Sequence, residues 1–270
     1  MSPRDNHPPV ERSPALPRTD SVPGLVLICD HASNAVPDWV TPLGLPPEDM
    51  ARHIAWDVGA RGLTLGLAAR LGAEAVLSTF SRLVIDPNRG EQDPTLVMKL
   101  YDGSIIEGNR GVDTGEVQRR IERLHRPYHL AIDEALDQVI AAGHSPVLVS
   151  MHSFTPQLRG RPIRPWHIGL LWDADDRLVV PLMKRLAGHS DLVVGDNEPY
   201  SGKLAGDCMW QHGTSRDIPH VLIEIRNDLI AEPAEQEAWA ELLAPIIRDA
   251  IGEMRLAEPE PVILSAQQPV

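Results

Sequence analysis

The sequence predicts an α/β fold with three layers, in which a mostly parallel or mixed sheet carries helices on both faces. Short apolar runs of β-type residues alternate along the chain with longer segments of helical periodicity. This alternation is typical of strands that are joined through helices. The run PVLVSMH at 146–152 is apolar almost throughout, as expected of a central strand buried on both faces.

The first half of the chain contains three predicted strands and two predicted helices. The strands are expected at 24–30, 74–80 and 82–85, and the helices at 58–71 and 114–142. The longer helix is the strongest signal, because Thr114 can cap it and its apolar residues fall on one face. Pro127 is expected to kink or split it. The stretch between, 86–111, is polar and rich in turn residues.

The second half continues the alternation. Strands are expected at 146–152, 167–172, 191–195 and 220–226, and helices from after 172 to about 187, near 204–211 and from about 233 to 255. Ligands of such sheets bind in the crevice at the carboxyl ends of the strands. Residues of a functional site should therefore lie where strands end.

Charge and composition exclude several classes of partner. The formal net charge of −13 argues against nonspecific nucleic-acid binding, which needs a basic surface. No apolar stretch approaches the roughly 18 residues of a membrane span. The two cysteines, Cys29 and Cys208, are too few for a disulfide framework and indicate a reducing compartment. We therefore expect a cytoplasmic protein; its oligomeric state is left open.

The termini differ in composition from the middle of the chain. Residues 1–22 are polar and rich in proline, and they lack the apolar core of a signal peptide. We expect a flexible N-terminal tail at 1–22, a single domain at 23–257 and a C-terminal tail at 258–270.

Four of the predicted strands end in polar groups that are capable of chemistry. Such convergence is expected of an α/β active site. The groups are Asp30 and His31, then Asp86, Asn88 and Arg89, then His152, and finally Glu224 and Arg226.

His31 and His152 are candidate metal ligands. Neutral imidazole binds zinc well, and a catalytic zinc usually takes three protein ligands and a water. The alternative is that each ring only caps its strand and bonds a backbone carbonyl.

Arg82, Asn88 and Arg89 are candidate substrate-binding residues. The planar guanidinium group grips a carboxylate through two parallel hydrogen bonds, so a short substrate with a carboxylate would suit this segment. The alternative is a plain ion pair between Asp86 and one of the two arginines.

Glu224 stands among apolar neighbours, where an acid is costly unless it is paired or functional. A raised pKa would let it act as general base and then as general acid. The alternative is a buried pair with Arg226, although neighbours two apart on a strand share a face, so a site would place both there as well.

Taken together, the motifs resemble the N-formylglutamate amidohydrolase family. They are DHASN at 30–34, DVGA at 57–60, SRLVIDPNR at 81–89, MHSFTP at 151–156, NEPYSG at 197–202 and IEIRNDLI at 223–230. The resemblance extends from about residue 24 to 255. More remotely, the pattern is similar to that of zinc carboxypeptidases and aspartoacylases. This similarity implies a fold like that of the zinc exopeptidases or the phosphorylase/hydrolase-like proteins.

The resemblance implies a hydrolase that depends on zinc or on another divalent metal. It also implies a role for each candidate residue. His31 and His152 would hold the metal, and Glu224 would be the catalytic carboxylate. The group that binds the substrate would comprise Arg82, Asn88, Arg89 and Arg226, with Tyr200 and Ser201 shaping the pocket unless their segment is a plain turn.

Asn34 departs from the related pattern, because the relatives with a His-x-x-Glu turn place a carboxylate ligand there. An amide is a weaker ligand, so either Asn34 binds weakly or another acid completes the set. Asp57 is the best candidate unless it only caps a helix. Asp30 is a further possibility, although it should point to the face opposite His31.

The activity implied is hydrolysis of a small anionic N-acyl amino acid, with N-formyl-L-glutamate giving glutamate and formate. Three alternatives stay open. The substrate could carry another acyl group or amino acid, as in a deacylase or a carboxypeptidase-like enzyme. The chain could be a non-catalytic protein that binds small carboxylates. A phosphorylase-like enzyme without metal is the third.

Overall fold

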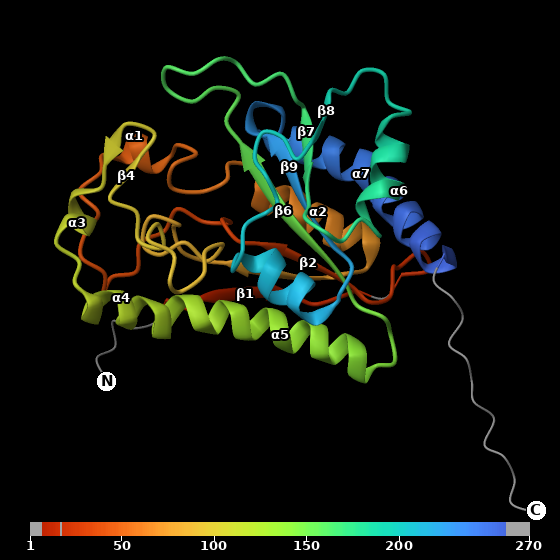
Figure 1. Cartoon of the computed structure of the whole chain (residues 1–270), viewed down its shortest axis with the longest axis horizontal. Helices are drawn as coiled ribbons and strands as arrows, with labels where there is room; N and C mark the ends of the chain where they lie inside the picture. The colour runs from red at the N-terminus through yellow and green to blue at the C-terminus, as the bar shows by residue number, and fades with distance from the viewer. Residues whose placement is uncertain (1–6, 17, 258–270) are drawn as a thin grey trace, which may run out of the picture.

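The structure is a computed structural model, and it describes residues 7–16 and 18–257. Its centre is a seven-stranded sheet with the strand order β1-β3-β2-β6-β9-β7-β8 (Figure 1). The strands are β1 (Val10–Ser13), β2 (Leu25–Cys29), β3 (Glu74–Ser78), β6 (Val147–Phe154), β7 (Ile168–Leu171), β8 (Val194–Asp196) and β9 (His220–Arg226). A separate hairpin joins β4 (Leu100–Tyr101) to β5 (Ser104–Ile105).

The sheet is mixed. The four strands β3, β2, β6 and β9 run parallel to one another, whereas β1 is antiparallel to β3 and β7 is antiparallel to β9. The carboxyl ends of the four parallel strands therefore meet at one edge. In this register His152 of β6 lies directly beside Glu224 of β9.

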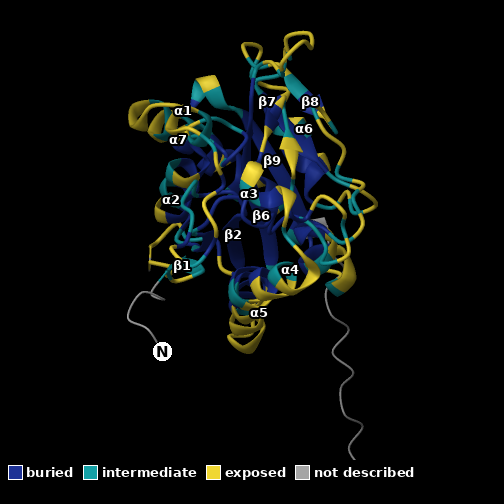
Figure 2. Ribbon diagram, turned by 90° about the vertical axis from the view of Figure 1, so that its left-hand side faces the viewer, coloured by how far each residue is buried: buried dark blue, intermediate teal, exposed yellow. Residues whose placement is uncertain are grey.

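Helices cover both faces of the sheet, which confirms the predicted three layers. One face packs against α2 (Ala60–Leu71), α6 (Val179–Leu186) and α7 (Pro233–Ala257), and the other packs against α5 (Arg126–Ala141). Consecutive residues of β2 illustrate this, because Leu27 belongs to the first core and Ile28 to the second. Figure 2 shows the buried strands at the centre and the exposed outer surfaces of helices and loops.

The predicted strand at 82–85 is wrong. These residues are fully or nearly buried, but they form a turn in which the Val84 N–H bonds the Ser81 carbonyl. Leu83, Val84 and Ile85 belong to a third apolar core under the loops of the first half of the chain, near α1 (Pro47–Met50) and α3 (Glu107–Arg110). A run of four apolar residues does not distinguish a strand from another buried segment.

The long helix predicted at 114–142 is interrupted. It consists of α4 (Thr114–Arg120), a π-helical turn at Ile121–His125 and α5. Pro127 lies in the first turn of α5, where its missing N–H and fixed φ are tolerated. The Arg126 N–H instead bonds the Ile121 carbonyl five residues back. The helix is thus split next to the proline, as predicted, and the interruption is a π-helical turn.

Two smaller expectations also change. Residues 10–13 were expected in a flexible tail, but they form β1, which adds to the sheet through backbone hydrogen bonds that apolar periodicity does not reveal. The short helix expected near 204–211 is a π-helical turn at Met209–Gly213. The C-terminal tail at 258–270 lies outside the described residues. Among those that are described, no helix combines the length and apolar character needed to cross a membrane.

Asn109 ties the loops of the third core together. Its side chain donates to the carbonyls of Leu83 (2.7 Å) and Met98 (2.8 Å) and accepts from Arg120 (2.8 Å). We expect Asn109→Ala to lower the free energy of unfolding by about 2–4 kcal/mol, because three buried partners lose their hydrogen bonds. Chemical denaturation measures this, with the exposed Glu107→Ala in the same helix as control. Equal stability of the two variants would contradict this role.

Candidate active site

A cavity of about 150 Å³ opens at the carboxyl ends of the parallel strands. His31 follows β2, His152 lies in β6 and Glu224 lies in β9, and all three line it. The position agrees with the general rule for ligand sites in α/β sheets.

Two histidines and one aspartate meet at the bottom of this cavity. One potential ligand atom from each of His31, Asp57 and His152 lies within 4.8 Å of the others, and all three residues are buried. Asp57 Oδ2 is 3.3 Å from Nδ1 of His31 and 2.8 Å from Nδ1 of His152. The loop before α2 brings Asp57 here, and its N–H bonds the carbonyl of His31 (2.9 Å).

The outer nitrogens of both rings are held by carboxylates. His31 Nε2 is 2.7 Å from Asp86 Oδ1, and His152 Nε2 is 2.7 Å from Asp30 Oδ2. Because an ionised carboxylate only accepts hydrogen bonds, each Nε2 carries the proton. In the neutral ring Nδ1 then has a lone pair, and both lone pairs point at Asp57.

Two lone pairs and a carboxylate require a cation between them. Without a metal, a proton takes that place: burial would lower the pKa of His152, but the hydrogen bonds of Asp30 and Asp57 raise it well above its usual value. A ring that donates one nitrogen to a carboxylate and offers the other is the usual arrangement of a metal-bound histidine. These residues therefore fit a divalent metal such as zinc.

Asp30 and Asp86, the carboxylates that accept from the two rings, are held in place by hydrogen-bond donors of their own. Asp30 accepts from the Tyr128 hydroxyl (2.8 Å) and from Ser150 Oγ (2.9 Å). Asp86 accepts from Arg82 Nη2 (2.7 Å) and from the backbone N–H of Asn88 (3.0 Å). Burial opposes their ionisation, yet their partners hold the pKa of both carboxyl groups below the usual range.

The structure does not bring Asn34 to this group. Its side-chain amide donates to the Met50 carbonyl (2.9 Å), outside the cavity lining. Asp57 occupies the third position instead. It does not cap the helix either, because Gly59 is the N-cap of α2 and no side chain caps it. Asp30 supports His152 rather than joining the group.

Glu224 lies in the cavity wall with an unpaired atom. It is 6% exposed, and within the described part of the chain its Oε2 meets no hydrogen-bond partner. Burial raises the pKa of this carboxyl group to about 7. In the same described part of the chain, the buried Nε of Arg82 at the cavity also has no partner. Buried polar atoms are rarely left unpaired, so a bound ligand would account for both atoms.

The predicted substrate-binding segment lies at the cavity. Arg82, Asn88 and Arg89 all line it. The predicted ion pair also exists, because Arg82 bonds Asp86 and lies 3.6 Å from Asp57. Arg82 thus pairs with two of the carboxylates and still has a nitrogen available.

The predicted substrate-binding residues from the second half of the chain do not all lie at the cavity. Tyr200 and Ser201 line the cavity, and Arg164 donates to the Tyr200 hydroxyl (3.0 Å). Arg226 does not line it: its Nε bonds Asp228 (2.8 Å) in the turn that follows β9. The two-residue spacing from Glu224 suggested a shared face, but Arg226 is the last residue of the strand and turns toward its local partner.

Sequence reasoning missed one residue of the site and the role of another. His53 lines the cavity 3.3 Å from Asp102 Oδ2, and no motif marked it. The signal that could have identified His53 is its position four residues before Asp57 in the same loop. The role of Asp86 as support for His31 was also missed, since its segment suggested only an ion pair.

Comparisons with known proteins identify the family. The sequence profile of the N-formylglutamate amidohydrolase family matches residues 24–231. The chain belongs to this family. It is therefore a hydrolase that acts on a linear amide, and the predicted resemblance is confirmed.

Individual relatives are similar to this chain in sequence or in fold. An N-formylglutamate deformylase of Pseudomonas putida is 27% identical over 192 residues, which cover 66% of this chain and 71% of the relative. The solved gene product Atu2144 of Agrobacterium tumefaciens is 34% identical with a TM-score of 0.85, over 92% of this chain and 96% of its own. An N-formylglutamate amidohydrolase of Ralstonia eutropha JMP134 shares the fold, with 24% identity and a TM-score of 0.67 over 93% and 100% of the two chains.

Proposed function

We propose that this chain hydrolyses the amide of an N-formyl amino acid, with N-formyl-L-glutamate as substrate and glutamate and formate as products. We further propose that a divalent metal, zinc in the first place, is held by His31, Asp57 and His152. The observation that carries the proposal is the meeting of two imidazole lone pairs with a carboxylate, beside the unpaired Oε2 of Glu224.

The protein's own residues would move the proton. A bound zinc would supply a Lewis acid and lower the pKa of a water to about 7. Glu224 accepts a proton from the attacking water at Oε2 and returns it to the amide nitrogen, so that the amine leaves neutral. A pKa of about 7 suits a group that must both take and give a proton near neutral pH.

The arginines would hold the substrate. Arg82 and Arg89 bring positive charge to a cavity in a chain with a net charge of −13, which favours a small dianion locally. Asn88 adds an amide whose oxygen accepts from the backbone N–H of Cys208 (3.1 Å), so its NH₂ group is oriented. The cavity volume of about 150 Å³ favours a short acyl group such as formyl.

A substrate panel tests the activity. We expect N-formyl-L-glutamate to be cleaved faster than N-acetylglutamate or the N-formyl forms of Asp, Gln and His, because the cavity is small and cationic. We also expect chelation to abolish turnover and added zinc to restore it; released amine and metal content are measured together. Binding of glutamate derivatives without turnover or metal would establish a carboxylate-binding protein instead, and turnover that depends on phosphate would establish a phosphorylase.

The third ligand is tested by a matched pair. Asp57→Asn should weaken zinc binding by at least about 100-fold, because loss of a mere supporting partner already costs about 10–100-fold. Asn34→Ala should retain the wild-type affinity, since its amide bonds Met50. Competition with a chromophoric chelator gives both values. The reverse ranking would restore Asn34 as a ligand.

Glu224 is tested as the proton carrier. Glu224→Gln preserves size but cannot exchange the proton, so kcat should fall by roughly 10²–10⁴-fold while zinc content and the circular dichroism spectrum stay unchanged. Arg226→Ala, two residues along the same strand, is the control and should retain kcat and KM. Near-normal kcat of Glu224→Gln would exclude this role, and a raised KM of Arg226→Ala would return that residue to the substrate site.

A further inference from the structure

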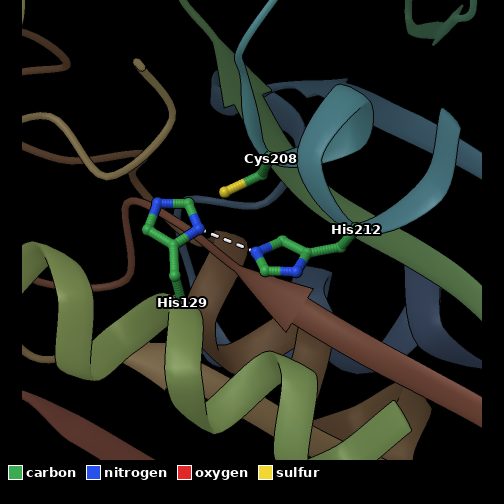
Figure 3. Close-up of side chains that lie close together, drawn as sticks. All are labelled: His129, Cys208 and His212. Atoms are coloured by element: carbon green, nitrogen blue, oxygen red, sulfur yellow. Dashed lines mark hydrogen bonds between the residues drawn. The ribbon is translucent and has the colours of Figure 1, made fainter. Parts of the chain in front are cut away.

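A second group of potential metal ligands lies outside the catalytic cavity. His129 projects from α5, whereas Cys208 and His212 come from the start and the interior of the π-helical turn at Met209–Gly213. Figure 3 shows the three side chains pointing toward one another. All three are buried, and their ligand atoms lie within 4.8 Å of one another.

The hydrogen bonds of the two rings determine where their protons lie. His212 Nδ1 is 3.0 Å from Asp133 Oδ1, and His129 Nε2 is 3.0 Å from the Pro87 carbonyl oxygen. Both partners only accept hydrogen bonds, so both of these outer nitrogens are placed to carry protons. The neighbouring His125 Nε2 lies 2.8 Å from the Arg89 carbonyl and 3.2 Å from His129 Nε2, and it donates to the shorter contact, the carbonyl.

The inner nitrogens then face each other with lone pairs. His129 Nδ1 and His212 Nε2 are 2.7 Å apart, so neutral rings in this arrangement repel unless a cation lies between them. A shared proton would leave an imidazolium in a site where His129 is 7% and His212 is 2% exposed. Burial opposes this charge, whereas the Asp133 carboxylate beside His212 favours it. A metal ion between the two rings would satisfy both lone pairs without using the outer nitrogens.

The surroundings match those of metal-bound histidines. Such rings donate their other nitrogen to a carboxylate or a backbone carbonyl, as His212 does to Asp133 and His129 does to Pro87. The catalytic group has the same arrangement, with Asp86 and Asp30 as the outer partners. Cys208 adds a sulfur, and a ligand set of two imidazoles and one thiolate suits zinc.

We infer that His129, Cys208 and His212 form a second metal site, which binds zinc through three protein ligands. Neutral rings bind the metal through their inner lone pairs, so binding releases the proton of the Cys208 thiol. The Cys208 thiol otherwise donates to the Pro87 carbonyl (3.3 Å), and it exchanges that hydrogen bond for the metal.

The site joins α5 to the segment that supports catalysis. Pro87 lies between Asp86, which holds His31, and Asn88, which lines the cavity. The backbone N–H of Cys208 bonds the Asn88 side chain (3.1 Å), and His129 bonds the Pro87 carbonyl. A metal ion bound here would hold both contacts and so position Asn88 beside the substrate.

Cobalt titration of the full-length, metal-stripped protein tests the inference. We expect two equivalents of Co²⁺ to bind, with a thiolate-to-cobalt charge-transfer absorption for one of them. Cys208→Ser should bind one equivalent and lose the absorption. Cys29→Ser, which alters the other buried cysteine, should keep both equivalents and the absorption. Asp57→Asn should lose only the equivalent that lacks this absorption.

The outcomes separate this site from the catalytic one. Binding of a single equivalent without thiolate absorption in the wild-type protein would overturn the inference and leave a shared proton between the rings. The wild-type spectrum alone decides this even if Cys208→Ser fails to fold, which circular dichroism reveals. Because Asp57→Asn keeps the thiolate absorption, failure of the proposed catalytic metal site would leave this result unaffected.

Discussion

The functional site depends on two hydrogen bonds, which His31 donates to Asp86 and His152 donates to Asp30. Each is 2.7 Å long and fixes the proton of its ring on Nε2, which leaves both Nδ1 atoms directed at Asp57. With the opposite tautomers the inner nitrogens would donate to Asp57 and no lone pair would remain for a cation. The ability to hold a metal thus follows from the outer partners as much as from the ligands themselves.

The three buried aspartates of the site need hydrogen-bond donors from other parts of the fold. Asp30, Asp57 and Asp86 are all almost completely buried, and isolated carboxylates in such places would be unstable. Tyr128 from α5 and Arg82 from the loops of the first half of the chain supply the compensating donors. One helical layer and these loops therefore both contribute to the site, and the hydrogen bond between Asn109 and Arg120 anchors the loops.

Much of the site was predictable because parallel strands end at one edge of a sheet. His31, His152 and Glu224 each follow or close an apolar run, so their convergence follows from the alternation of strands and helices. Failures occurred where a contact is not encoded locally. Asn34 has the spacing of a ligand but bonds Met50, whereas Asp57, 26 positions from His31, arrives through a loop. Arg226 has the spacing from Glu224 that predicts a shared face of the strand, but its side chain bonds Asp228 instead.

The sequence by itself determined the layered α/β architecture, the strand ends that carry chemistry and the family, because apolar periodicity and ordered motifs are local properties. Only the tertiary structure decided which acid joins the two histidines, which carboxylates orient them and that His129 meets Cys208 and His212. Those choices depend on hydrogen bonds between segments up to 122 residues apart. Side-chain direction within loops and at the ends of strands follows from packing, which no short stretch of sequence records.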